Sequence, residues 1–150
     1  MKGYLLDTNV ISMLSPSRAE ASSAFLDWLD RMDAEGKVFL SVVTIHEIEK
    51  GIALLEHKGN TAKAAGLKVW LVGLLATYDD KIVALDAASA TYSGQFEATA
   101  ISAGHDPGMA DAIVAGIAKA HDLVVVTRNT KHFLPFGGVV SSPDEVTRSA

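Results

Sequence analysis

The chain has 150 residues, 49% of them hydrophobic, with no cysteine and a formal net charge of −5. This length and composition describe one globular domain with a substantial core, and they exclude a disulfide scaffold and thiol chemistry. The negative charge argues against nucleic-acid binding by bulk electrostatics but leaves nucleases open, because a bound cation reverses the local field of an acidic site.

The apolar runs of the chain are all short. None approaches the roughly 18 unbroken apolar residues that a membrane span needs. Asp7 interrupts the only apolar run near the N-terminus, so the chain shows no signal peptide. We therefore expect a cytoplasmic protein that makes no contact with a membrane.

Five apolar runs predict β-strands, over residues 3–6, 38–43, 82–85, 123–127 and, weakly, 138–140. They are rich in leucine and β-branched residues and do not alternate with polar ones, which is typical of strands covered on both faces. Between them, apolar residues at helical spacing predict helices over residues 19–33, 44–58, 62–78, 87–103 and 109–121. The residues after Asp7 indicate the start of one more helix.

Strands that alternate with helices imply an α/β fold with right-handed crossovers. We expect a single domain over residues 1–140, with a short parallel sheet of about four or five strands flanked by helices on both faces. Residues 141–150 are expected to form a polar C-terminal tail.

Asp7 is the most informative residue, because it is a lone carboxylate at the end of the first predicted strand. Ligands of open α/β sheets bind beyond the carboxyl ends of the strands, and a charge at the edge of an apolar sheet needs a compensating partner. The alternative is that Asp7 only caps the following helix. Glu47, Asp111 and Asn129 occupy similar boundaries, and together these side chains suggest a divalent metal and phosphoester chemistry.

Glu47 has a competing structural interpretation. Thr44 and Glu47 match the capping-box pattern, in which Glu47 reaches back to the Thr44 amide. Glu49 lies roughly 200° further around a helix, so Glu47 and Glu49 cannot share one face. The residues alone favour Glu47 slightly and leave the choice open.

Asp111 falls in the first turn of the predicted helix 109–121. A negative charge is favourable at a helix N-terminus whether or not it has a function. The surrounding alanine- and isoleucine-rich sequence, however, is unusual for an exposed cap. A carboxylate in such apolar surroundings favours a bound cation.

The polar loop after the strand 123–127 is the fourth candidate. Thr127 or Asn129 could complete a metal shell, directly or through water, while Arg128 and Lys131 could contact phosphates. The alternative is a polar loop with an asparagine turn. Asp86 also ends a strand, but it is read more simply as a helix cap.

Other phosphate-handling folds fit the sequence less well. A receiver-type signalling module needs paired acids after the first strand and an acceptor aspartate after the third, and the first strand offers only Asp7. A haloacid-type phosphatase needs two acids separated by one residue, and here Asp7 is followed by Asn9. The chain also lacks a Walker A loop, a G-x-G-x-x-G loop and an H-E-x-x-H motif.

Four segments in order, residues 5–11, 41–51, 111–115 and 126–133, resemble the motifs of PIN-domain ribonucleases. More narrowly, they resemble the toxin half of VapBC-type (FitB-like) toxin–antitoxin pairs. The resemblance runs from Tyr4 to about Val140. It implies a parallel sheet with an acidic pocket that holds Mg²⁺ or Mn²⁺.

The resemblance also assigns roles by position. Asp7, Glu47 and Asp111 match the three core metal-binding acids, which decides in favour of Glu47 over Glu49. Asn129 stands where many PIN nucleases have a fourth acid, as in the FitB-like branch. The supporting residues it implies are Thr8, Asn9 and Thr127.

The activity implied is endoribonuclease cleavage of RNA that leaves 5′-phosphate and 3′-hydroxyl ends. The implied partners are a cognate antitoxin that covers the acidic pocket and a second copy of the chain. We expect the small-residue faces of residues 87–103 and 110–120 to form that homodimer interface. The alternative function, for which Asn129 is the hint, is a catalytically weak PIN-like scaffold that binds RNA or a partner protein.

Overall fold

The computed structural model describes residues 1–148 and contains a five-stranded, entirely parallel sheet. The strand order is β3-β2-β1-β4-β5, so β1 is central and pairs with β2 on one side and β4 on the other. The predicted α/β class is therefore confirmed. The strands are β1 (Gly3–Leu6), β2 (Val38–Ser41), β3 (Ile82–Val83), β4 (Leu123–Val126) and β5 (Val140–Ser141).

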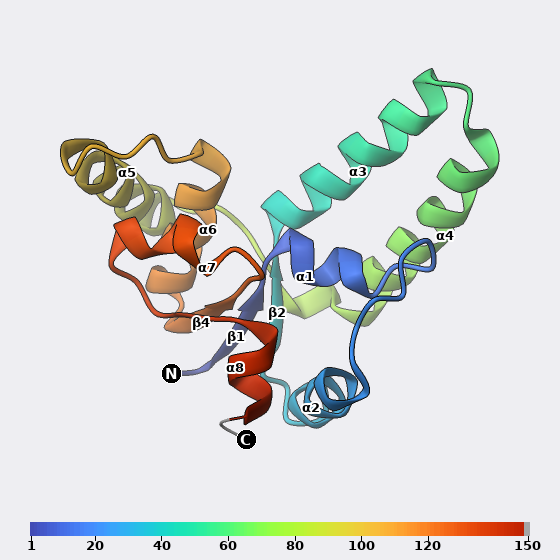
Figure 1. The fold of residues 1–150 in the computed structure, drawn as a ribbon, viewed down its shortest axis with the longest axis horizontal. Helices are drawn as coiled ribbons and strands as arrows, with labels where there is room; N and C mark the ends of the chain where they lie inside the picture. Colours follow the sequence, from blue (N-terminus) through green and yellow to red (C-terminus); the bar gives the residue numbers. More distant parts are fainter. Residues whose placement is uncertain (149–150) are drawn as a thin grey trace.

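Helices cover both faces of the sheet (Figure 1). One face carries α1 to α4 and α8, and the other carries α5 to α7, while α3 and α4 form an antiparallel pair that extends away from the sheet. Within residues 1–148, no helix has the length and apolar character to cross a bilayer. The helices are α1 (Thr8–Met13), α2 (Ser23–Ala34), α3 (Val42–His57), α4 (Thr61–Thr77), α5 (Ala87–Ser102), α6 (Met109–Ala120), α7 (Thr130–Phe133) and α8 (Pro143–Arg148), with short 3₁₀ turns η1 (Asp79–Lys81) and η2 (Leu134–Phe136).

The central strand β1 contributes side chains to two hydrophobic clusters, because successive side chains of a strand point to opposite faces of the sheet. Leu6 packs with Trp28 and Ile52 beneath α1 to α4, and Leu5 packs with Ile117 beneath α5 to α7. All five side chains are almost completely buried. The two-sided burial explains why the strand sequences show no polar alternation.

Helices α5 and α6 approach closely at Gly116. A Cβ atom at this position would lie only 2.7 Å from the amide nitrogen of Ser93 and would also meet the carbonyl oxygen of Ser89. The small residues of these two helices therefore pack against each other within one chain. The faces that meet at Gly116 are therefore not free to pack against a second copy, and where a homodimer interface would lie stays a prediction.

Helix α3 begins earlier than predicted. The Ser41 hydroxyl accepts a hydrogen bond from the Thr44 amide at 3.4 Å, so Ser41 is the N-cap and the helix starts at Val42. The capping box of Thr44 and Glu47 is therefore wrong, and Glu47 lies in the second turn. The apolar, β-branched pair Val42 and Val43 favoured a longer strand in the sequence.

The C-terminal segment expected as a polar tail instead begins with the last residue of β5 and forms helix α8 from Pro143 to Arg148. Ser142 and Glu145 form a capping box: the Ser142 hydroxyl accepts from the Glu145 amide at 3.1 Å, and the Glu145 carboxylate accepts from the Ser142 amide at 3.2 Å. Helix α8 packs against α2, and Val146, which is 4% exposed, joins the cluster around Phe25 and Trp28.

Candidate active site

An acidic cavity of ≈ 290 Å³ opens at the carboxyl ends of β1 and β4. It collects residues from five parts of the chain: the β1–α1 junction with α1, the loop after α1, α3, the start of α6 and the loop after β4. Its lining residues are Asp7, Thr8, Asn9, Ser12, Arg18, Glu47, Asp111 and Asn129.

Asp7 is the most buried acid of the cavity, at 7% exposure. It is the N-cap of α1 as well as a lining residue, so the two interpretations of Asp7 are compatible. Its carboxylate accepts hydrogen bonds from the Thr8 amide at 2.9 Å, the Thr127 hydroxyl at 2.9 Å and the Asn9 amide group at 3.4 Å. All three donors are neutral, so none of them compensates its charge.

Burial raises the pKa of Asp7 from 3.8 to about 6. The hydrogen bonds from Thr127 and Thr8 oppose this shift, and the nearby carboxylates of Asp111 and Glu47 add to it. The negative charges of Asp111 and Glu47 therefore act on Asp7, although the three residues are distant in the sequence. A buried acid in this state is stabilised by a positive partner.

The Thr127 hydroxyl joins the loop after β4 to Asp7. It is fully buried, donates to Asp7, and accepts from the Asn9 side chain and the Asn129 amide, each at 3.1 Å. The Asn9 side-chain oxygen Oδ1 in turn accepts from the Arg128 backbone amide at 3.0 Å. These contacts fix the orientation of the Asp7 carboxylate.

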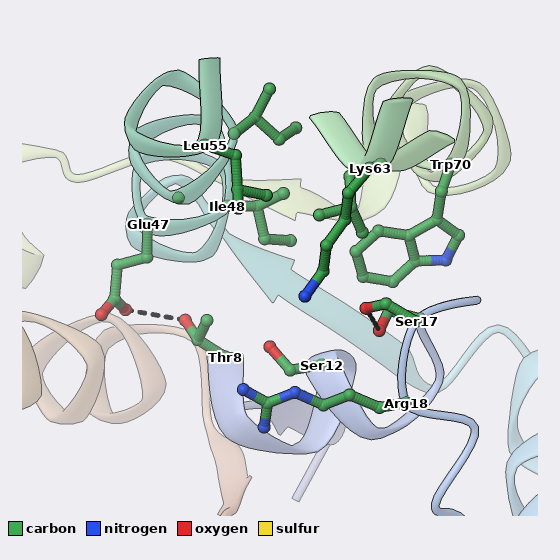
Figure 2. Close-up of a pocket in the computed structure, with 13 residues that line it drawn as sticks. Thr8, Ser12, Ser17, Arg18, Glu47, Ile48, Leu55, Lys63 and Trp70 are labelled. Atoms are coloured by element: carbon green, nitrogen blue, oxygen red, sulfur yellow. Dashed lines mark hydrogen bonds between the residues drawn. The ribbon is translucent and has the colours of Figure 1, made fainter. Parts of the chain in front are cut away.

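Glu47 points from α3 toward α1, where its carboxylate accepts a hydrogen bond from the Thr8 hydroxyl at 2.7 Å (Figure 2). The Thr8 hydroxyl also lies 3.0 Å from the hydroxyl of Thr44, which is fully buried. Glu49, the other acid considered from the sequence, is exposed and does not line the acidic cavity.

Asp111 lies in the first turn of α6, as predicted. Burial raises its pKa; the nearby His132 imidazole lowers it and the Glu47 carboxylate raises it further. The Nδ1 atom of His132 is 3.8 Å from the Asp111 carboxylate. Asp111 also borders a second cavity of ≈ 340 Å³, whose lining includes Lys131 and His132.

The donor atoms of the acidic cavity fit a hard divalent cation. Carboxylate, hydroxyl and amide oxygens are the ligands that Mg²⁺ and Mn²⁺ prefer, and Asp7 forms no ion pair with any of the described residues. Among residues 1–148, no three His, Asp or Glu side chains are already arranged to hold an ion. The Glu47 carboxylate is already engaged by the Thr8 hydroxyl.

The basic residues near the cavity differ from those expected. Arg128 lies outside the acidic cavity and forms a 3.3 Å ion pair with Glu20, whereas Lys131 lines the second cavity, which Asp111 also borders. Arg18 does line the acidic cavity and was missed. It lies in a loop without a recognisable motif, so only the folded chain brings it to this place. Asp86 caps α5 by accepting from the Ser89 amide at 2.8 Å, as expected.

Known proteins resemble this chain along almost its whole length. Residues 4–134 match the PIN domain family. The chain is 34% identical to toxin FitB of Neisseria gonorrhoeae over 93% of this chain and 96% of FitB, and 31% identical to the tRNA(fMet)-specific endonuclease VapC of Shigella flexneri over the same shares. A crystal structure of FitAcB from Neisseria gonorrhoeae superimposes with a TM-score of 0.80 at 34% identity, covering 93% of this chain and 97% of that one. The chain therefore belongs to the PIN-domain family, among the VapC- and FitB-type toxins of toxin–antitoxin systems.

Proposed function

We propose that this protein is a divalent-metal-dependent endoribonuclease that acts in the cytoplasm as the toxin of a toxin–antitoxin pair. The observation that carries the proposal is the acidic cavity, in which the hydrogen-bond donors to Asp7 from the described residues are all neutral and burial raises the pKa of Asp7 to about 6. Similarity to a protein named as an endonuclease supports the same reaction class.

The proposed roles follow from the position of each side chain. Asp7 and Asp111 anchor Mg²⁺ or Mn²⁺, and Glu47 holds the ion or orients the attacking water. When bound, the cation supplies a more acidic water and neutralises charge on the scissile phosphate. Thr127 and Thr8 orient the carboxylates of Asp7 and Glu47, and Asn129 contributes a neutral amide at the rim of the cavity.

A metal titration tests this function. The purified chain, incubated with single-stranded RNA and with tRNA, should produce fragments with 5′-phosphate ends once Mn²⁺ or Mg²⁺ is added, and excess EDTA should stop the reaction. Cleavage that survives EDTA would contradict the metal requirement. RNA binding without cleavage at any metal concentration would support the scaffold function instead.

We also propose that a cognate antitoxin neutralises the protein by placing a basic side chain in the acidic cavity. A cation there would satisfy Asp7 in the same way as a metal ion, since burial and neighbouring acids both raise its pKa. As a test, the gene next to the one that encodes this chain is expressed together with it. If its product is a small protein that co-purifies with this chain and blocks RNA cleavage, that product is the antitoxin.

A homodimer is the remaining part of the proposal, and an exposed apolar surface supports it. Val42, Leu85 and Met109 are 37%, 42% and 69% exposed, and they border an open apolar depression of ≈ 480 Å³. Leu85→Lys should weaken dimerisation by roughly tenfold or more, because it places an unpaired charge in the contact. Sedimentation equilibrium measures this, and a wild-type chain that stays monomeric at high concentration would contradict the dimer.

A further inference from the structure

A groove of ≈ 230 Å³ lies between α1, α3 and α4 and joins the acidic cavity (Figure 2). The two share Thr8, Ser12, Arg18 and Glu47, so they form one continuous depression. We call this part the α1–α4 groove. Its remaining lining is Ser15, Ser17, Ile48, Gly51, Ile52, Leu55, Lys63, Leu67 and Trp70.

Two cations project into the α1–α4 groove. Figure 2 shows Lys63 reaching down from α4 and Arg18 extending from the loop after α1 toward Ser12. Both side chains are exposed, and neither forms an ion pair with an acid in the described part of the chain. Lys68, on the same helix α4, differs because it pairs with Glu56 at 3.1 Å.

The loop that carries Arg18 is held firmly. The Ser15 carbonyl oxygen accepts from the amides of Arg18 at 3.1 Å and Ala19 at 2.9 Å, and Ala19 adopts a left-handed φ of 50°. The ion pair between Glu20 and Arg128 ties the end of the loop to the segment after β4. Arg18 therefore starts from a fixed backbone, which lowers the entropy lost on binding a ligand.

We propose that Arg18 and Lys63 form a phosphate-binding subsite that holds the RNA strand beside the acidic cavity. This inference rests on the proposed ribonuclease function. A polyanion is repelled by the carboxylates of Asp7, Glu47 and Asp111, so its approach needs positive charge next to them. The groove supplies that charge on the Glu47 side, and Lys131 lines the second cavity on the Asp111 side.

Salt-dependent binding tests the subsite. A labelled single-stranded oligoribonucleotide is titrated with the chain in an Asp111→Asn background, which removes cleavage, alone and combined with Arg18→Ala, Lys63→Ala or the control Lys68→Ala. Each loss of a phosphate contact should weaken binding about fivefold at 0.1 M salt and lower the slope of log Kd against log salt by about 0.7. Lys68→Ala should change neither, and Arg18→Lys should retain the slope.

Activity gives an independent readout. In the otherwise native chain, Arg18→Ala and Lys63→Ala should raise KM with kcat largely retained, since both cations lie beside the acidic cavity and hold substrate.

An unchanged Kd and salt slope in both alanine variants would overturn the subsite. The same holds if the variants lose affinity for a poly-glutamate peptide but not for RNA, because that result assigns the groove to a protein partner. A wild-type chain that binds RNA but does not cleave it would contradict the proposed function and not the subsite. The subsite would still be tested by comparing RNA binding of the wild type and the alanine variants.

Discussion

Asp7→Asn should reduce metal-dependent RNA cleavage roughly a thousandfold or more, because losing a metal-anchoring charge removes several kcal/mol of transition-state stabilisation. The same change should stabilise the metal-free protein at neutral pH. Asp7 is buried, hydrogen-bonded only to neutral donors, and close enough to Asp111 and Glu47 to be destabilised by their charges. Loss of activity with a gain in stability distinguishes a functional acid from a structural one.

The pH dependence of this effect has a definite sign. The Asp7 pKa is about 6 in the folded chain and 3.8 as its model value, so between these values the folded state binds the extra proton. The free energy of unfolding of the metal-free wild type should therefore fall as pH rises from about 4 to 6, by about 3 kcal/mol from this group. The free energy of unfolding of Asp7→Asn should not show this fall between about pH 4 and pH 6. Part of its gain in stability at neutral pH should be offset, because the amide nitrogen of the new asparagine cannot accept a hydrogen bond from Thr127.

Urea unfolding at pH 4.5 and pH 7.5, with EDTA and with Mn²⁺, measures the free energy of unfolding of the wild type and of Asp7→Asn. The cleavage rate of both proteins is measured separately. Mn²⁺ should stabilise the wild type but not the variant. Glu49→Gln is the matched control, because this exposed acid lies outside the cavity and should keep both activity and pH profile. A metal-free Asp7→Asn variant that is less stable than the wild type at pH 7.5 would show that Asp7 is a structural cap.

Thr127→Val should destabilise the protein by about 3–5 kcal/mol, although the two side chains have nearly the same shape. The fully buried hydroxyl donates to the Asp7 carboxylate and accepts from the Asn9 side chain and the Asn129 amide. Valine leaves one charged acceptor and two donors without this partner, and a lost hydrogen bond to a charged group is the most costly of these. Cleavage should also fall, because Asp7 loses the contact that orients it.

Thr127→Ser separates the hydroxyl from the methyl group, since it keeps the three hydrogen bonds and loses only one buried methyl. It should retain most of the stability and activity. The deficit of Thr127→Val should shrink at pH 4.5, because the Thr127 hydrogen bond lowers the Asp7 pKa and its loss matters less once Asp7 is protonated. Equal stability of the valine and wild-type proteins in urea at pH 7.5 would rule out this role.

The parts of the molecule governed by local pattern could be predicted from the sequence. The strand at residues 3–6 was predicted with the same bounds as β1, and β4 to within one residue, because buried parallel strands are short, continuous apolar runs. Strand ends of a parallel sheet meet at one edge, which is why Asp7 and Glu47 were expected to lie close together, and the family resemblance added Asp111 from the start of a helix. The structure brings them to one cavity, and their catalytic roles stay predictions.

The features that were missed depend on contacts between distant segments. Helix α8 is stabilised by Val146 packing near Trp28, although the Ser142–Glu145 capping box was a readable signal. The pairing of Arg128 with Glu20 joins residues 108 positions apart, and no local pattern shows that this cation is used within the chain. Arg18 reaches the cavity only through the folded loop after α1.

The strand order also bears on when this protein becomes active during its synthesis. The central strand β1 is made first, yet one of its two neighbours is β4, and the hydroxyl that orients Asp7 follows that strand, 120 positions later. Pairings over such separations form late in folding. A nascent chain still lacking β4 and the loop after it therefore has no complete acidic cavity, so the proposed ribonuclease activity would arise only when translation is nearly finished.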